Sequence, residues 1–393
     1  MVYTPEFYSL CDKVSEAKDK LKVPYKSIES FCGPGGLSLG LHGAGFELTY
    51  AFDADSSAVK THTNNLSGVA EVEDVRKLRG KDVFEKSQID AGELALFSGG
   101  PPCQGFSKQK RGAHLGDSRN NLVLDYARLV SELEPRYFLF ENVAIFGKKR
   151  GADLLRKMAN SLQNYRLYSR TVNSVDFGLA QTRRRFLVVG QRYDQVPEFQ
   201  FPENIIDKLL TVGDVLGGLP EPPEDFTVHP DFFNHQRSRV SEINIKRFSL
   251  VPQGGGWKDI PFELRLPCHQ KVDSSKGGWP DVYGRLVWEG QCPTITGGFD
   301  SFTRGRYGHP LRDRALTPRE AARLQGFPDS YHFFGNRSDV RSQIGNAVPP
   351  PLAYAIGIEI LRVLLVHDGF LSQDRKNRLL LERADAIYNC NLI

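Results

Sequence analysis

Residues 94–107 place a cysteine in a rigid turn directly after an apolar run. The run 94–97 has the composition of a buried strand in a parallel sheet, and two glycines and two prolines end it before Cys103. Prolines fix φ and remove backbone donors, so the turn presents the thiol in one direction. Ligands of open α/β sheets bind at the carboxyl ends of strands. A free cysteine is usually buried and unreactive, but a Pro-Pro-Cys-Gln turn at this edge favours a nucleophile.

A carboxyl group follows the next strand pattern in the same way. Residues 137–140 predict a further buried strand, and Glu141 stands at its end. Because parallel strands end at one edge of a sheet, we expect Glu141 to lie close to Cys103. The alternative is a carboxylate in a salt bridge at the end of a strand. A thiol and a carboxyl group at one site predict covalent catalysis, in which the thiolate attacks and the carboxyl group stabilises the developing charge.

A glycine-rich loop earlier in the chain predicts a nucleotide-like ligand. A short strand over 27–31 enters the loop 32–40, which opens a helix, and the following strand ends at Asp53, twenty residues after Gly33. An acid at this spacing typically holds the hydroxyl groups of an adenosine ribose. Ser38 stands where a dinucleotide motif has its third glycine, which counts against a nicotinamide dinucleotide. A plain tight strand-to-helix turn is the alternative.

The bulk composition is that of a globular protein, and its charge is unevenly distributed. The 393 residues are 40% hydrophobic and carry a net charge of +4, which decides nothing about nucleic acid by itself. Residues 301–325, however, hold six arginines against two acids, and residues 108–119 hold four basic side chains against one acid. Basic segments near glycine-rich turns predict contact with a polyanion. A solvated charged surface is the alternative.

Cysteine spacing, the first residues and the apolar run near the end of the sequence bear on metal binding and on the cellular compartment. The six cysteines include no C-x-x-C pair and no zinc spacing, so we expect free thiols and no metal site. The first residues lack the basic and apolar regions of a secretory signal. The apolar run 356–366 contains two charged residues and is too short to cross a bilayer. We expect a monomeric cytoplasmic protein without membrane association.

Strand and helix patterns alternate through the first 192 residues, and residues 122–133 fit a helix. This alternation predicts an α/β fold with a doubly wound, Rossmann-like sheet. Beyond residue 194 prolines recur and periodicity fades, and residues 250–310 predict an irregular strand-and-loop domain. Thr317 is predicted to cap a new helix, and a final apolar helix follows. We expect one domain formed by residues 1–192 and 340–393, and a smaller one formed by residues 193–339.

These blocks, in this order, resemble the DNA (cytosine-5) methyltransferases of the prokaryotic type. The blocks that carry the resemblance are 31–36, 53, 74, 100–104, 141–143, 181–185, 319–325 and 345–350. The resemblance implies an S-adenosylmethionine-dependent methyltransferase sheet with a separate target-recognition domain. It also implies transfer of a methyl group from S-adenosyl-L-methionine to C5 of a cytosine flipped out of duplex DNA. Cys103 would add to C6 of the ring, Glu141 would bind N3, and Arg185 would bind the carbonyl oxygen.

The resemblance also assigns residues to the cofactor and to DNA. Asp53 would hold the ribose and Asp74 the adenine amino group, while Ala54 replaces a common aromatic residue over the adenine. The full cofactor set would be Phe31, Gly33, Pro34, Gly35, Gly36, Asp53, Ala54, Asp74, Val75, Pro101, Leu122, Asn346 and Val348. The loop 105–119 would close over the DNA. DNA contacts are expected from Gln104, Ser107, Arg119, Arg183, Arg304 and Arg306, with a structural role as the alternative for Arg183.

Other functions remain open from the sequence. A nicotinamide-dependent oxidoreductase would share the sheet but has no use for the Pro-Pro-Cys turn. A non-catalytic DNA-binding relative is disfavoured by the presence of Cys103, Glu141 and Arg185. A tRNA cytosine-5 methyltransferase of the same family is the main alternative, but the long divergent region 193–312 favours duplex DNA. A DNA methylase of this kind either works alone or belongs to a restriction-modification system, in which a cognate endonuclease acts on the same site without a stable complex.

Overall fold

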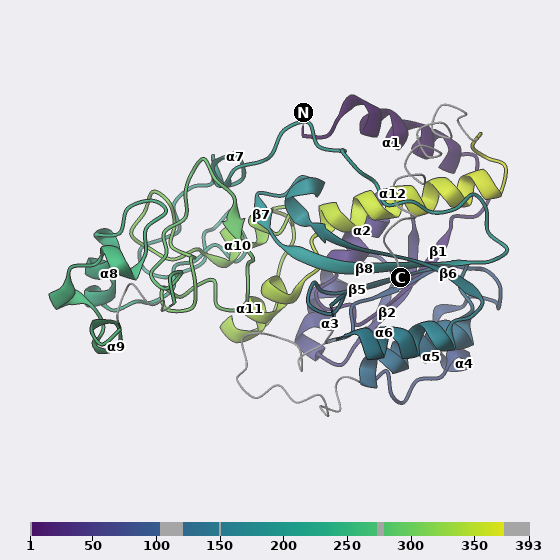
Figure 1. Ribbon diagram of the computed structural model, residues 1–393, viewed down its shortest axis with the longest axis horizontal. Helices are drawn as coiled ribbons and strands as arrows, with labels where there is room; N and C mark the ends of the chain where they lie inside the picture. The colour runs from purple at the N-terminus through teal and green to yellow at the C-terminus, as the bar shows by residue number, and fades with distance from the viewer. Residues whose placement is uncertain (1, 103–120, 149–150, 273–278, 373–393) are drawn as a thin grey trace.

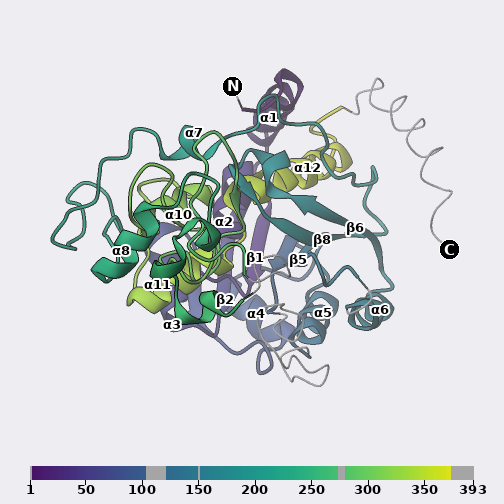
Figure 2. The same ribbon diagram turned by 60° about the vertical axis from the view of Figure 1, so that its left-hand side comes forward.

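A sheet with helices on both faces forms the main body of the protein (Figures 1 and 2). A loop-rich lobe, described over residues 193–272 and 279–339, extends from one end of it. The computed structural model describes residues 2–102, 121–148, 151–272 and 279–372.

The sheet has seven strands in the order β3-β2-β1-β4-β5-β8-β6. β1 to β5 run parallel, whereas β8 is antiparallel to both β5 and β6. The predicted doubly wound α/β sheet is confirmed, with an antiparallel edge that the sequence did not predict. The link from β6 to β8 holds only a short turn of 3-10 helix, η3, and the two-residue strand β7, which leaves no room for a crossover helix. The strands are β1 (Lys26–Ser30), β2 (Glu47–Asp53), β3 (Val69–Val72), β4 (Leu94–Gly99), β5 (Tyr137–Val143), β6 (Tyr165–Asn173) and β8 (Arg184–Arg192).

Helices cover the two faces of the sheet and bury alternate strand residues. Phe138 and Phe140 of β5 pack toward one layer of helices, and Leu139 between them packs toward the other. α5 spans Leu122–Leu133, as predicted. The first layer contains α4 (Gly80–Ser87), α5 and α6 (Ala152–Ser161), and the second contains α1 (Pro5–Lys18), α2 (Gly36–Ala44) and α12 (Pro350–His367).

α12 forms the centre of the second layer. By length and composition residues 337–367 could cross a membrane, but 78% of their most apolar window is buried inside the protein. Burial on all sides explains why this helix lacks a polar face. A Cβ atom on Gly40 of α2 would lie 2.3 Å from the Pro350 carbonyl oxygen, so glycine is required for the close approach of α2 and α12.

The lobe contains little regular structure. The sequence predicted strands in this region, and that part of the prediction is wrong. Within the described residues 193–272 and 279–339, β9 is the only named strand, and it pairs with β7. Recurrent prolines remove the donors that strand ladders need. The predicted helix after Thr317 is present, with Thr317 and Glu320 forming a reciprocal capping box. The remaining elements are α3 (Ser56–Asn65), η3 (Ser174–Phe177), β7 (Gln181–Thr182), α7 (Val212–Leu216), α8 (Glu242–Ser249), η4 (Trp257–Asp259), η5 (Phe262–Leu264), α9 (Pro267–Gln270), β9 (Cys292–Pro293), α10 (Pro318–Leu324) and α11 (Arg337–Asn346).

Buried arginines hold these loops together in place of strand ladders. Arg285, 6% exposed, donates to the carbonyl oxygens of four residues and to the carboxylate of Asp313. Arg319, fully buried, donates to three further carbonyl oxygens. Each guanidinium has five N–H donors in a rigid plane, so a single side chain can satisfy several loop carbonyls that a ladder would otherwise pair.

Candidate active site

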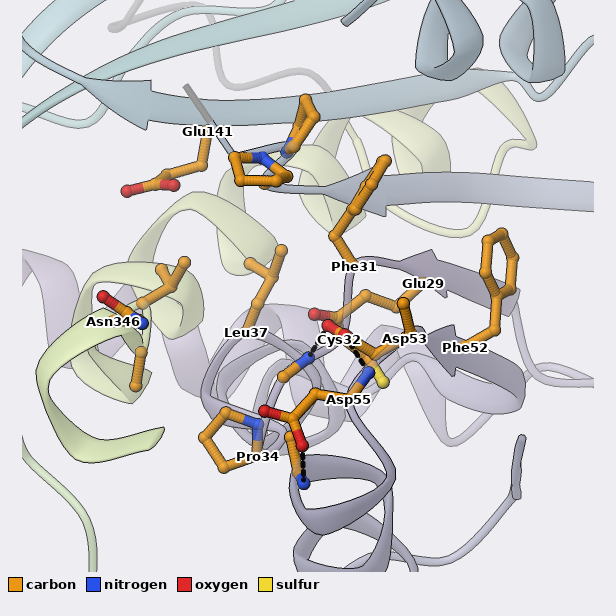
Figure 3. Close-up of a pocket in the computed structure, with 18 of the residues that line it drawn as sticks. Glu29, Phe31, Cys32, Pro34, Leu37, Phe52, Asp53, Asp55, Glu141 and Asn346 are labelled. Atoms are coloured by element: carbon orange, nitrogen blue, oxygen red, sulfur yellow. Dashed lines mark hydrogen bonds between the residues drawn. The ribbon is translucent and has the colours of Figure 1, made fainter. Parts of the chain in front are cut away.

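One cavity of about 670 Å³ opens at the carboxyl ends of β1, β2, β4 and β5. Figure 3 shows Asp53 and Glu141 on different sides of this cavity, with Asn346 from the end of α11 across from Asp53. The structure therefore brings together residues that are far apart in the sequence. Those of the predicted site that line it are Phe31, Gly33, Pro34, Gly36, Asp53, Ala54, Asp74, Val75, Pro101, Leu122, Glu141, Arg185, Asn346 and Val348.

The glycine-rich loop forms the floor of the cavity. Gly33 has φ +53° and Gly35 has φ +96°, both in the left-handed region that favours glycine. A Cβ atom on Gly36 would lie 2.2 Å from the Val348 carbonyl oxygen, so the start of α2 packs directly on the segment after α11. Gly35 was expected in the cofactor set, but it does not line the cavity: its α-carbon faces Leu66 and Tyr331 behind the loop.

Asp53 is fixed at the end of β2 by backbone donors. The Gly33 N–H donates to Oδ2 and the Asp55 N–H donates to Oδ1, each at 2.9 Å. Burial raises the pKa of Asp53, and these two hydrogen bonds act in the opposite direction. Each carboxylate oxygen keeps a second lone pair that can accept a hydroxyl group from the cavity. Asp53 can therefore bind a diol.

Asp74 lies at the rim and is paired with Arg76. The guanidinium donates to both carboxylate oxygens, with Nε 2.8 Å from Oδ1 and Nη2 2.6 Å from Oδ2, and it lowers the pKa of Asp74. The Arg76 side chain is 64% exposed, so the pair contributes little stability and leaves Asp74 accessible. Asp74 is thus a hydrogen-bond acceptor at the rim of the cavity.

Glu29 is a cavity residue that the sequence did not reveal. It is 2% exposed, and its Oε2 accepts a hydrogen bond from Ser38 Oγ, which lies 3.1 Å from His62 Nε2. Burial raises the pKa of Glu29 to about 8 and lowers that of His62 to about 4. In the sequence Glu29 falls inside a strand pattern, which does not distinguish it as a site residue. The available signal was Ser38, a hydroxyl in place of a motif glycine.

Replacing Glu29 by glutamine is expected to stabilise the free protein at alkaline pH. The folded protein keeps the Glu29 proton up to about pH 8, whereas the unfolded chain loses it near its ordinary pKa of 4.5. Stability therefore falls as the pH rises between these values, and the penalty is complete above pH 8. Urea unfolding at pH 8.5 should show Glu29→Gln more stable than the wild type by up to ~5 kcal/mol, because the two pKa values differ by about 3.5 units and each unit is worth about 1.4 kcal/mol.

Glu16→Gln removes an exposed carboxylate and serves as the control for this comparison. It should leave the pH dependence of unfolding unchanged. Near pH 5 the Glu29→Gln variant and the wild type should have similar stability. Equal pH dependence of the wild type and Glu29→Gln across this range would show that Glu29 does not hold its proton in the folded protein.

Glu141 and Arg185 form an ion pair at the opposite wall. Arg185 Nε lies 2.8 Å from Glu141 Oε1, and the two side chains are only 13% and 11% exposed. The strands that carry them are neighbours, because β5 and β8 pair antiparallel. The salt bridge considered as the alternative for Glu141 does exist, but its partner is the other predicted catalytic side chain. A Cβ atom on Gly100 would lie 3.0 Å from Glu141 Oε2, so a side chain there would shift the carboxylate by a few tenths of an ångström.

The end of β4 is locked to the end of β5 beside this pair. Asn142 Nδ2 donates to the Pro101 carbonyl oxygen at 3.0 Å, and the Val143 N–H donates to Asn142 Oδ1 at 2.9 Å. Pro101 and Pro102 line the cavity. Cys103, Gln104, Ser107 and Arg119, all predicted site residues, lie outside the described residues.

Two of the three remaining arginines predicted to contact DNA have other partners. Arg183 is fully buried and donates to the carbonyl oxygens of three residues, so the predicted DNA contact is wrong and the structural alternative holds. Arg306 Nη1 donates to the Gly254 and Gly255 carbonyl oxygens at 2.7 and 2.6 Å, and its side chain remains 22% exposed, so its contact with DNA stays a prediction. Arg304 is exposed on the lobe.

Comparisons with known proteins agree with this site. Residues 25–362 match the family described as C-5 cytosine-specific DNA methylase. The chain is 32% identical over 346 residues to the Type II methylase M.HgiDII of Herpetosiphon aurantiacus, covering 86% of this chain and 95% of the relative. It is 33% identical over 368 residues to the Type II methyltransferase M.XorII of Xanthomonas oryzae pv. oryzae, covering 86% of this chain and 84% of the relative.

Solved structures show the same architecture. A crystal structure described as a putative DNA modification methyltransferase encoded within a prophage, from E. coli, superimposes with a TM-score of 0.65 at 28% identity, over 86% of this chain and 99% of the other. The S. pombe Dnmt2 methyltransferase superimposes with a TM-score of 0.52 at 18% identity, over 88% of this chain and 98% of the other, a likeness of fold alone.

Proposed function

The chain belongs to the C-5 cytosine-specific DNA methylase family and is a DNA (cytosine-5-)-methyltransferase, and we propose that it uses S-adenosyl-L-methionine to methylate a flipped-out cytosine in a specific duplex sequence. The observation that carries the proposal is the single cavity that joins the glycine-rich loop to the Glu141–Arg185 pair. A cofactor and a base bound in one cavity can react directly.

The cavity residues fit the cofactor. The volume of about 670 Å³ is in the range of small-molecule sites. Asp53 would accept the ribose hydroxyl groups, and Asp74 would accept the adenine amino group. Phe31 and Val75 supply apolar surface. When bound, S-adenosyl-L-methionine supplies an electrophilic methyl group.

The chain's own residues would make the cytosine reactive. The Cys103 thiolate would add to C6, which forms an S–C6 bond and turns the ring into an enamine whose C5 is nucleophilic. Arg185 would donate to the carbonyl oxygen through guanidinium N–H groups that are bonded neither to Glu141 nor to the Arg184 carbonyl oxygen, while Glu141 would bind N3. Once C5 carries the methyl group, loss of its proton to a base restores the C5–C6 double bond and expels the thiolate.

We assign sequence recognition to the loop-rich lobe. We propose that residues 1–192 and 340–393 form the catalytic domain and residues 193–339 the target-recognition domain. Exposed loops suit base-edge contacts in the major groove, where all four base pairs differ. We also propose that the protein acts as a cytoplasmic monomer, either alone or alongside an endonuclease that reads the same site.

Bisulfite sequencing of plasmid DNA from cells that express the chain tests the function. We expect protected cytosines within one recurrent sequence motif, and none in the same plasmid from cells without the chain. Suppose that bisulfite converts every cytosine of the plasmid and that methylated cytosine is found instead in tRNA of the same cells. This result would assign the enzyme to the RNA-methylating branch of the family.

The same assay locates the recognition residues. Replacing residues 193–312 by those of a relative with another specificity should change the protected motif. Arg304→Ala should relax one base position, or weaken all sites evenly and reduce the salt dependence if the side chain binds phosphate. Arg156→Ala on α6, where the side chain is 70% exposed, removes the same charge and should have no effect. An active chimera that keeps the original motif would place specificity in the catalytic domain.

A further inference from the structure

Arg183 is a buried cation held only by main-chain oxygens among the described hydrogen bonds. Its Nη1 donates to the Ile295 carbonyl oxygen at 2.8 Å, and its Nη2 donates to those of Gly345 and Ala347 at 3.0 and 2.9 Å. Its Nε is buried with no hydrogen-bond partner. Burial lowers the pKa of Arg183. A charged group buried without a carboxylate costs free energy, so its position calls for an explanation.

The three carbonyl oxygens belong to two different parts of the molecule. Ile295 lies in the lobe, between β9 and the loop that leads to Arg304. Gly345 and Ala347 flank Asn346 at the end of α11, where Asn346, Ala347 and Val348 line the cavity. One guanidinium therefore joins a lobe segment to the cavity wall.

Neighbouring contacts leave this junction little freedom. Gln181 Oε1 accepts from the Ile295 N–H at 2.8 Å, and its Nε2 donates to Gln325 Oε1 at 2.8 Å. A Cβ atom on Gly345 would lie 2.4 Å from the Gly297 nitrogen, so α11 packs directly on the lobe backbone. A shift of the Ile295 segment must therefore move either the end of α11 or Arg183 itself.

The same extended stretch also reaches the catalytic pair. Arg185 follows Arg183 by two residues and pairs with Glu141 in the cavity. The stretch 181–185 thus contacts the lobe, the cavity wall and the catalytic carboxylate within five residues. A planar guanidinium can hold carbonyls on two segments at once, whereas a lysine ammonium is a point charge that cannot span them in the same way.

We propose that Arg183 is a positioning residue that couples target recognition by the lobe to cofactor binding in the cavity. The proposal rests on the proposed function and adds the residue through which the two binding events communicate. When DNA orders the Ile295 segment, Arg183 transmits this order to the Gly345–Ala347 wall of the cavity. The binding of DNA and the binding of the cofactor therefore favour each other. The coupling is reciprocal, because it is a free energy shared by both sites.

Calorimetry with S-adenosylhomocysteine, a non-reactive probe of the cofactor site, measures this coupling. The dissociation constant is compared with and without duplex DNA that contains the protected motif. In the wild type we expect DNA to tighten binding about tenfold, within the usual range of such couplings. In Arg183→Lys the factor should fall to about threefold or less, while the affinity without DNA changes little.

Arg285→Lys is the matched control. Arg285 is also a buried arginine that donates to carbonyl oxygens, but all its partners lie within the lobe. Its replacement should lower the melting temperature and weaken DNA binding while the ratio of the two dissociation constants stays at the wild-type value. A merely structural Arg183 would behave like Arg285 in this comparison.

Three outcomes overturn the proposal: no coupling in the wild type, wild-type coupling in Arg183→Lys, or an equal loss of coupling in both lysine variants. None of these outcomes concerns the reaction itself. If the wild type protects plasmid cytosines and the coupling is unchanged in Arg183→Lys, the proposed function stands. Only the coupling role of Arg183 is then contradicted. A wild type that protects no cytosine contradicts the proposed function.

Discussion

Replacing Cys103 by serine is expected to abolish methyl transfer and to leave DNA binding within a few-fold of the wild type. The serine hydroxyl has nearly the same size, so the contacts with DNA persist. An alcohol is a far weaker nucleophile than a thiolate, and no neighbouring base has been assigned that would activate it. Transfer of a tritiated methyl group to DNA, with a gel-shift measurement of binding, checks both parts.

Cys268→Ser is the control, because this cysteine is exposed on the lobe. It should retain full transfer. A duplex with 5-fluorocytosine at the target position adds an independent measurement, since fluorine cannot leave as a cation and the adduct persists after methyl transfer. The wild type should form a complex that survives denaturation, and Cys103→Ser should not. Full turnover by Cys103→Ser would exclude the covalent mechanism.

Glu141→Gln is expected to lower kcat by about 10²–10³-fold with little change in the affinity for S-adenosylhomocysteine. Glutamine keeps the shape of the side chain but cannot form the ion pair with Arg185 or exchange a proton with N3. The pair lies on the wall opposite the glycine-rich loop, where the base is proposed to bind, so we expect the effect on the chemical step. Single-turnover kinetics at saturating DNA measure it directly.

Glu93→Gln provides a matched disruption of an ion pair. Glu93 binds Lys26 at 2.9 Å at the amino ends of β4 and β1, opposite the cavity, with its side chain 51% exposed. This variant should keep wild-type kcat. A Glu141→Gln enzyme whose kcat stays within about threefold of the wild type would remove Glu141 from the reaction.

Local patterns predicted much of the site. The Gly33 turn, Asp53 at a strand end, and the helix Leu122–Leu133 follow from residue types over short windows, and the structure has each of them in place. Strand direction is different, because an apolar run looks the same whichever way it pairs. The antiparallel β8 therefore required the structure.

The arginines show a second limit of the sequence. A cluster of arginines in a loop-rich region indicates positive charge, but the spacing does not say whether a guanidinium turns outward to phosphate or inward to carbonyl oxygens. Arg304 is exposed, whereas Arg183 and Arg306 turn inward. The choice depends on which loop carbonyls lack a ladder partner, and that is a property of the folded lobe.

The inward arginines of the lobe bear on how such an enzyme could acquire a new target. Arg285 and Arg306 bind main-chain oxygens, which every amino acid possesses. Substitutions at the exposed loop positions therefore leave these bonds intact. In a scaffold of strand ladders and interlocked side chains, the same substitutions would disturb packing. Mutation can explore new base contacts at the surface of this lobe while a few inherited arginines preserve its shape.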